Sequence, residues 1–599
     1  MVPQTGCTGE ITKARPGGQT RLAAAGACAA LVAACAFLAE PLAAEPVTIT
    51  VHSGARQLFR GMGAGTTNRT SYQKLPQPVR DTLAAMVWRD LDFRMIRLMS
   101  SLGDYAVEYF AGRFGLYLED VKKHQPDIRI LFTPDMMHST MFRPPQNETE
   151  LRRYAAMYAE QIARLASEYD IEIHATGICN EPNDKVNEGE DDWVHRLTPG
   201  QIARVITYFR EELDARGLSK VKVIAPETSN VDSYARNVVD AIAADSQSLA
   251  SLHAFATHSY NYCMTKQMRD KAAPFGKEFW QTEASSGDPE DFNNAPEAVK
   301  AVARLLSDCN LGVNYWLWFL AYDKFKPTSN TPRLIGFDPA TGVFRAFLKY
   351  FYFKQASAAF RPGTYFRHAT SSLSFPDDTA YGYDRYKYME NRAHEKPPLC
   401  AAAGVNADST WAIGIANQTG IVSHWDMASY SPAATYNVTV SVEELLDSGE
   451  VEFYVYRSNA TVKAKLVDTV TMNDGKVTVK VRPHDFVTLR TDHRYAGRTD
   501  VCGLTRGLRY AEPSLRAFHT PAGTEIILRM PPGGGSMPLH LAAYDTRGRQ
   551  VAVLAHRPFA PGEHRVSWRG PAGSAAAGIY ILRLRGASVR QSVRVTAGR

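Results

Sequence analysis

Two acidic residues follow short apolar runs, at positions where their side chains could do chemistry. Glu181 follows the run 171–178 in an Asn-Glu-Pro segment, and Glu283 ends the run that begins at residue 278. They are 102 residues apart, about 34 for each of three βα units. Two carboxyl groups facing one cleft suit cleavage of a glycosidic bond, because one protonates the leaving oxygen while the other attacks the anomeric carbon. The pattern predicts that Glu181 and Glu283 form such a catalytic pair.

Other polar residues at the ends of apolar runs would tune these two carboxyl groups. Arg97, near the end of the run 95–99, supplies a positive charge that would keep one carboxylate ionised, while burial and negative charge raise the pKa of the other. Three alternatives stay open: Arg97 in a purely structural ion pair, Glu227 as a rival carboxylate, and His258 as a hydrogen-bonded barrel histidine.

The elements that must position these residues alternate along the first half of the chain. Apolar, β-rich runs alternate with amphipathic stretches such as 148–169 and 199–216, which is typical of βα units around a parallel sheet. Eight such units predict a (β/α)8 barrel, whose catalytic groups lie at the carboxyl ends of the strands. The eight runs are 59–64, 95–99, 128–132, 171–178, 221–225, 255–258, 278–282 and 312–319.

The pattern changes near residue 355 to period-two strands separated by Asn, Asp and Gly turns. We therefore predict a signal peptide at 1–44, a catalytic barrel at 45–354 and a β-sandwich at 355–495. The early strand at 47–52 is a candidate to pair into this sandwich. A linker at 496–513 leads to a small all-β module at 514–599. This last module resembles the immunoglobulin-like modules, some of them sorting signals, that end many bacterial secreted proteins.

Several motifs together resemble glycoside hydrolase family 30, which joins a barrel to a side β-sandwich. Besides Asn-Glu-Pro and Thr-Glu, they are Phe-Arg-Gly-Met-Gly-Ala-Gly from Phe59, His-Ser-Tyr from His258, Tyr-Trp-Leu-Trp from Tyr315 and the segment from Phe353 to Gly363. The match spans residues 46–495. It departs from the family where the third run ends in Phe132-Thr-Pro-Asp, since the family usually has Ser-Pro-Trp there.

The resemblance implies that Glu181 is the acid/base and Glu283 the nucleophile, and it implies roles for further residues. Asn180 would donate to the sugar 2-hydroxyl, and Tyr260 would steady the nucleophile Glu283. Trp316 or Trp318 would form an apolar platform under a sugar ring. Alternate strand residues share a face, so these two tryptophans either both face the site or both belong to the core.

The N-terminus and composition indicate an exported protein. Three basic residues precede the apolar run 22–38, and small residues follow it; a lipoprotein anchored through Cys35 is the alternative. No later run is long enough to span a membrane. The net charge is only +6, and no run of Lys and Arg lies among aromatic residues, so no nucleic-acid partner is indicated. The cysteines are widely spaced, so they indicate no metal site.

We therefore expect a secreted or cell-surface retaining β-glycosidase that needs no cofactor or metal. Its partner would be a carbohydrate substrate, with export machinery or the cell surface as further partners of the last module. Two alternatives stay open: a non-catalytic glycan-binding protein on the same scaffold, and a related barrel glycosidase of β-glucuronidase or β-xylosidase type.

Overall fold

The computed structural model falls into two compact units, residues 1–498 and 499–599, each of which is described by itself. The described residues are 44–66, 69–100, 106–134, 147–187, 193–258, 260, 265–285, 291–326, 332–373, 398–420, 432–492, 514–520, 523–530, 537–547, 549–560, 562–568, 578–585 and 590–597. The predicted signal peptide and Cys35 lie outside them, apart from Ala44. Among the described residues, no helix is both long and apolar enough to cross a membrane.

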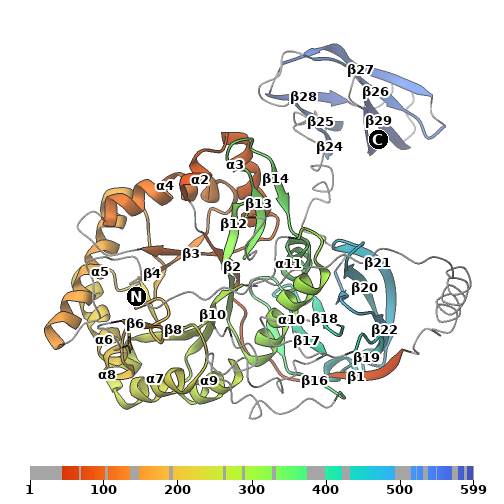
Figure 1. The fold of residues 1–599 in the computed structure, drawn as a ribbon. Coiled ribbons are helices and arrows are strands. Elements are labelled where there is room, and N and C mark those ends of the chain that lie inside the picture. The colour runs from red at the N-terminus through yellow and green to blue at the C-terminus, as the bar shows by residue number, and fades with distance from the viewer. Residues whose placement is uncertain are drawn as a thin grey trace, which may run out of the picture. The chain divides into compact units, whose positions relative to one another are not determined.

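Eight parallel strands close into a barrel in the first unit (Figure 1). Each of the eight apolar runs contributes one strand, so the prediction of a (β/α)8 barrel is confirmed. The strands are β2 (Gly61–Gly65), β3 (Met95–Ser100), β4 (Arg129–Pro134), β5 (Ala175–Thr176), β8 (Lys222–Thr228), β9 (Leu252–Thr257), β10 (Glu278–Ala284) and β11 (Tyr315–Trp318). The barrel interior is a packed apolar core, with Trp280, Tyr315 and Leu317 among its members.

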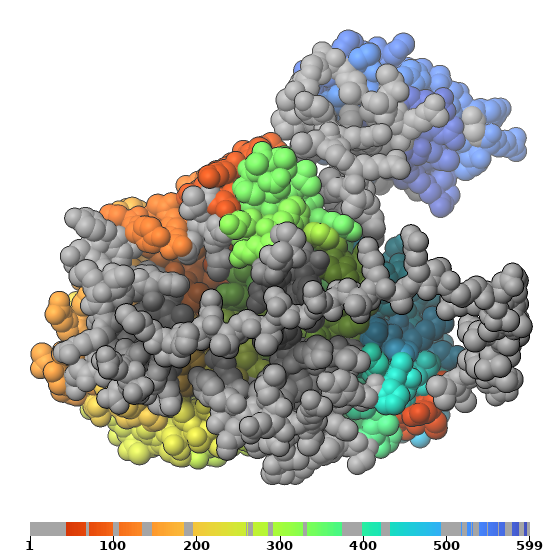
Figure 2. All heavy atoms as spheres, viewed as in Figure 1, coloured from red at the N-terminus to blue at the C-terminus, as the bar shows by residue number. Residues whose placement is uncertain are grey.

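Helices surround this barrel, and α4 to α7 lie along its outer side (Figure 1). Figure 2 shows atoms of this part of the chain, coloured orange to yellow, at the surface. Side chains cap them where the sequence predicts a start. Asn147 accepts a hydrogen bond from the amide of Glu150, and Thr198 forms a capping box with Gln201. The helices are α2 (Arg69–Gln73), α3 (Gln77–Ala84), α4 (Ala106–His124), α5 (Glu148–Tyr169), α6 (Pro199–Ala215), α7 (Ser233–Ala244), α8 (Ser246–Ser251), α9 (Thr265–Ala272), α10 (Ala295–Leu311) and α11 (Leu348–Ala359).

Short strands elaborate two of the loops that follow barrel strands. β6 (Lys185–Asn187) and β7 (Trp193–His195) form a hairpin after the Asn-Glu-Pro segment. β12 (Leu320–Lys324), β13 (Arg333–Phe337) and β14 (Phe344–Ala346) form a small sheet after β11. Both additions extend from carboxyl ends of barrel strands, where substrate-facing loops of such barrels lie.

A ten-stranded sheet domain adjoins the barrel and encloses its own apolar core. The early strand β1 belongs to it, parallel to β19 and antiparallel to β16. Gln355 on α11 ties the two parts together, because its amide donates to the carbonyls of Tyr456 and Phe486. The strands are β1 (Glu45–Val51), β15 (Tyr365–Arg367), β16 (Ala369–Ser371), β17 (Leu399–Val405), β18 (Trp411–Asn417), β19 (Tyr436–Val442), β20 (Glu450–Ser458), β21 (Lys465–Asn473), β22 (Lys476–Val481) and β23 (Phe486–Arg490).

The C-terminal unit contains two antiparallel sheets around a separate apolar core. One consists of β24 (Ser514–Thr520), β25 (Gly523–Met530) and β28 (Gly562–Trp568), and the other of β26 (Met537–Tyr544), β27 (Gln550–Phe559), β29 (Gly578–Arg585) and β30 (Arg590–Ala597). β26 and β27 flank the turn that begins at Asp545. Its likeness to immunoglobulin-like modules stays a prediction.

Candidate active site

Arg97 lies at the centre of a buried cluster at the carboxyl ends of the barrel strands. Its guanidinium donates to Oε2 of Glu283 at 2.5 Å, to Oε1 of Glu227 at 3.2 Å and to Oδ1 of Asn180 at 2.8 Å. Burial opposes the charge on Arg97, but Glu227, Glu283 and Glu181 outweigh it and raise its pKa. Arg97, on β3, is therefore a fixed cation that joins side chains from β8, β10 and the segment after β5.

Glu283 receives a second donor from the opposite side. The hydroxyl of Tyr260 donates to Oε1 of Glu283 at 2.5 Å. Burial, together with the charge of Glu283, raises the pKa of Tyr260 well above its usual value, so the phenol keeps its proton. Arg97 and Tyr260 thus orient the Glu283 carboxylate and balance its charge.

His258 links Glu181 to the same cluster. Burial, reinforced by Arg97 and partly offset by Glu283, lowers the pKa of His258 to about 4, so the imidazole is neutral at pH 7. Its Nε2 lies 3.3 Å from a guanidinium nitrogen of Arg97, which can only donate. Nδ1 therefore carries the proton and donates to Oε1 of Glu181 at 3.0 Å.

The two predicted catalytic carboxyl groups converge. A carboxylate oxygen of Glu181, one of Glu283 and a ring nitrogen of His258 all lie within 4.8 Å of one another. These three atoms are of the kinds that ligate a metal cation, but the guanidinium of Arg97 already forms an ion pair with Glu283. The structure also brings in Asn180 and Tyr260, so six of the eight predicted site residues belong to one cluster.

Glu227 lies beneath this cluster and is fully buried. Besides Arg97, it accepts a hydrogen bond from Thr133 at 3.1 Å. Gly177 is needed beside it, because a Cβ there would lie 1.8 Å from Oε2 of Glu227. From the sequence, Glu227 is only a rival carboxylate, and no role is predicted for Thr133 or Gly177. The one signal is that a glycine three residues before Asn180 indicates a close approach of another group to the backbone.

The backbone is strained at two of the three carboxylates. Glu181 has φ 46° and Glu227 has φ 57°, in the left-handed region that residues other than glycine rarely adopt. The amide of Glu181 donates to the carbonyl of Glu227 at 3.1 Å, which joins the two strained positions. Such strain persists only where the surrounding contacts over-determine it, and it is typical of functional sites.

The prediction that Trp316 or Trp318 forms a sugar platform is wrong. Both side chains are buried on the outer face of β11, where their rings pack against Phe353 of α11. The indole of Trp316 also donates to Asp308 of α10 at 2.9 Å. Since Tyr315 and Leu317 point into the barrel, strand alternation turns both tryptophans toward the helices.

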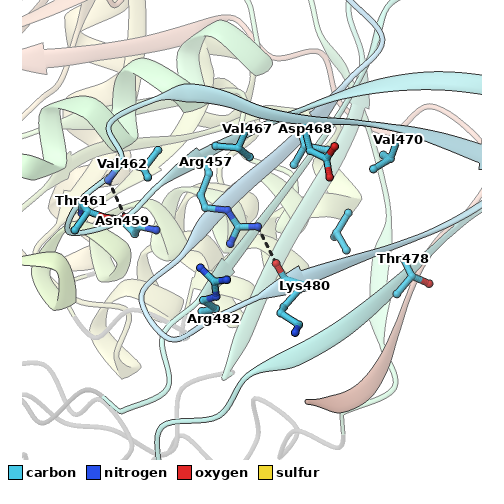
Figure 3. Close-up of a pocket in the computed structure, with 12 residues that line it drawn as sticks. Arg457, Asn459, Thr461, Val462, Val467, Asp468, Val470, Thr478, Lys480 and Arg482 are labelled. Carbon is cyan, nitrogen blue, oxygen red and sulfur yellow. Dashed lines mark hydrogen bonds between the residues drawn. The ribbon is translucent and has the colours of Figure 1, made fainter. Parts of the chain in front are cut away.

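A second concave site, with a volume of about 410 Å³, lies in the sheet domain between β20, β21 and β22 (Figure 3). Arg457 crosses it and donates to the carbonyl of Lys480 at 2.9 Å. Asp468 is the one acidic residue of its lining, and no lining residue is aromatic. This groove therefore lacks both the carboxylate pair for glycosidic cleavage and a ring on which a sugar could stack.

No family model matches the chain. A curated relative, the glucuronoxylanase XynC of Bacillus subtilis (strain 168), is 25% identical over 276 residues, which cover 43% of this chain and 59% of the relative. The matched part is thus less than two thirds of that protein.

Several solved structures share the fold. The catalytic domain of family 30 xylanase C from Talaromyces cellulolyticus is 14% identical, with a TM-score of 0.53, over 74% of this chain and 99% of that chain. A family 30 subfamily 8 xylanase from Clostridium acetobutylicum is 15% identical over the same shares, with a TM-score of 0.52. An endo-β1,6-glucanase is 16% identical over 76% of this chain and 95% of its own, with a TM-score of 0.51. The chain therefore shares with these family 30 structures the fold of a (β/α)8 barrel with an adjoining sheet domain.

Proposed function

We propose that the chain is a retaining β-glycosidase that hydrolyses a β-linked polysaccharide, with Glu283 as nucleophile and Glu181 as acid/base. The observation that carries the proposal is the approach of their carboxylate oxygens to within 4.8 Å. Retaining enzymes hold the two carboxyl groups about 5 Å apart, whereas inverting enzymes need about 6.5–9.5 Å to admit a water.

In the first step, an oxygen of Glu283 attacks the anomeric carbon while Glu181 gives its proton to the glycosidic oxygen. The bond from the anomeric carbon to that oxygen breaks, and the leaving sugar departs as an alcohol. In the second step, Glu181 takes a proton from water, whose oxygen attacks the same carbon and displaces Glu283. Two inversions retain the configuration and require no cofactor.

The contacts of each carboxyl group support this division of roles. Glu283 accepts hydrogen bonds from Arg97 and Tyr260, as suits an ionised nucleophile. Glu181 instead accepts a hydrogen bond from the neutral imidazole of His258. The imidazole can donate to an oxygen of this carboxyl group in both its protonated and its ionised form. Asn180, held by Arg97, would donate to the sugar 2-hydroxyl.

The relatives support a polysaccharide as the substrate class. The names of these proteins describe a glucuronoxylanase, xylanases and an endo-β1,6-glucanase. We propose that this chain also acts on a β-linked polymer, outside the cytoplasm, after removal of residues 1–44. A panel of β-linked xylans, glucans and chromogenic β-glycosides identifies the sugar.

Product stereochemistry tests the proposal directly. Proton NMR in the first minutes of hydrolysis should show the β-anomer accumulating before mutarotation. An initial α-anomer would reject the retaining pathway. Tight glycan binding with no hydrolysis of any substrate in the panel would instead favour a glycan-binding protein on the same scaffold.

A further inference from the structure

The C-terminal unit is far more basic than the rest of the chain. Residues 514–599 contain twelve arginines, no lysine and three acidic residues, although the net charge of the whole chain is only +6. The remainder of the chain is therefore slightly acidic. A unit with such an imbalance creates a positive field that attracts polyanions.

The excess charge of this unit is concentrated on its four-stranded sheet. Strands β26, β27, β29 and β30 contain no Asp or Glu. The three acidic residues lie elsewhere: Asp545 binds Arg549 at 2.9 Å, while Glu525 and Glu563 each bind Arg565 at 3.0 Å. The three acidic residues of the unit thus neutralise arginines in one turn and in the sheet of β24, β25 and β28.

Strand alternation places three arginines on the outer face of this sheet. Leu582 and Leu584 are buried in the core of the unit, so Arg583 and Arg585 point the other way. On β30, Val593 and Val595 pack against the same core, so Arg594 also lies on the outer face.

Two histidines extend this outer face across the neighbouring strands. His540 on β26 stands opposite Arg585 on one side and His556 on the other. The two imidazole rings contact each other, with centroids 5.2 Å apart. We call this set the arginine face: His540, His556, Arg583, Arg585 and Arg594.

The arginines of this face are available to a ligand. Arg585 and Arg594 are exposed, and the guanidinium of Arg583 covers the ring of Tyr544 at 4.7 Å. None of the three forms an ion pair with a described residue. Alternate residues on a strand are about 6.6 Å apart and neighbouring strands about 4.8 Å, so an extended anionic chain can contact several guanidinium groups at once.

We propose that the arginine face binds a polysaccharide that carries carboxylate groups. The planar guanidinium forms paired hydrogen bonds with a carboxylate, which suits a unit containing arginine but no lysine. Among the described residues of this face, Tyr544 is the one tyrosine, phenylalanine or tryptophan, and Arg583 covers its ring, so it cannot stack on the bases of a single-stranded nucleic acid. The choice of a polysaccharide among polyanions rests on the proposed function.

The test measures binding of the full chain to polygalacturonate, a polymer with one carboxylate per sugar. The variant Arg583→Gln/Arg585→Gln/Arg594→Gln removes three charges from the arginine face. The matched control, Arg547→Gln/Arg549→Gln/Arg565→Gln, removes three charges from the turn and the other sheet. We expect the first variant to lose at least about tenfold in affinity and the control less than about threefold, with binding weakened by salt.

Three outcomes would overturn the proposal. They are equal losses of affinity in both variants, no binding of the wild type to polygalacturonate at low salt, and binding of DNA as tight as that of polygalacturonate. Hydrolysis of a small soluble β-glycoside separates this failure from failure of the proposed function. The arginine-face variant should keep its kcat on that substrate, while Glu283→Gln should lose kcat and still bind polygalacturonate. Unchanged circular dichroism and melting temperature show that the variants fold.

Discussion

Each end of the barrel holds a charged cluster, buried at the carboxyl end and partly exposed at the amino end, and strand β10 contributes a glutamate to both. At its carboxyl end, Glu283 belongs to a cluster of three carboxyl groups around Arg97. At its amino end, Glu278 accepts from Arg60 at 2.8 Å and from the indole of Trp280 at 2.8 Å. Arg129 and Lys222 begin the barrel strands β4 and β8 at the same end, so cations outnumber carboxylates among these four described charged residues.

The difference separates reactivity from stability. Burial opposes ionisation of Glu278, but hydrogen bonds from Trp280 and Arg60 lower its pKa, so this carboxylate is stably ionised. The carboxyl-end cluster gathers three carboxyl groups around Arg97, and it includes the strained residues Glu181 and Glu227. Glu278 therefore serves the fold, whereas Glu283 serves the proposed chemistry.

The largest expected effect distinguishes these two glutamates. Glu283→Gln should lower kcat by about 10⁴-fold or more, because an amide cannot form the covalent intermediate. Glu278→Gln, the matched control on the same strand, should keep kcat within about threefold. Steady-state kinetics on a chromogenic glycoside measure both, and comparable losses in the two variants would erase the distinction between the barrel ends.

Glu227→Gln should lower kcat by about 10³-fold, because Arg97 would lose its buried partner and no longer hold Glu283 and Asn180 in place. KM should change far less than kcat. Gly177→Ala should act in the same way, since its Cβ would collide with Glu227. Wild-type kcat in both folded variants would show that Glu227 does not position Arg97.

His258→Gln sharpens the comparison through pH. The pKa of His258 is about 4, below its unfolded value, so the unfolded state binds more protons between pH 6.5 and 4, and the wild type loses stability as pH falls through that range. Removing the imidazole should abolish roughly 3 kcal/mol of this loss. Urea denaturation at several pH values measures it.

His174 provides the control at the amino end, because burial first and then Lys222 lower its pKa to about 4 as well. His174→Gln should also flatten the stability profile, but only His258→Gln should shift the acidic limb of kcat/KM. A shift of that limb in His174→Gln would contradict the separation of the two clusters.

The smallest effect concerns the stability supplied by Glu278. Its pKa is lowered in the folded state, so the stabilisation is present above the unfolded pKa and disappears as pH falls through the folded pKa. Glu278→Gln should therefore lower the free energy of unfolding by about 1.5 kcal/mol at pH 7 and by less in acid. A deficit independent of pH would contradict this electrostatic origin.

Much of the barrel could be predicted because buried parallel strands read as continuous apolar runs. The carboxyl ends of two such runs also predict where Glu181 and Glu283 lie, since parallel strands bring these ends to one rim. Arg97 and His258 follow from the same rule. The structure brings all four together.

What failed depends on packing that no local pattern contains. Alternation shows that Trp316 and Trp318 share a face, but the helices decide which one, because Phe353 and Asp308 offer them partners outside the barrel. No local pattern predicts the roles of Thr133 and Gly177, because these roles come from contact with Glu227, which lies on a different strand.

Trapping the covalent intermediate tests the central claim most directly. A 2-deoxy-2-fluoro glycoside with a good leaving group should slow both steps, and it should let the glycosyl-enzyme accumulate. Mass spectrometry of its peptides should find the sugar on Glu283 and on no other residue. The Glu278→Gln control should carry the same label on Glu283. A label on Glu181 or Glu227, or substrate turnover without any label, would contradict the account.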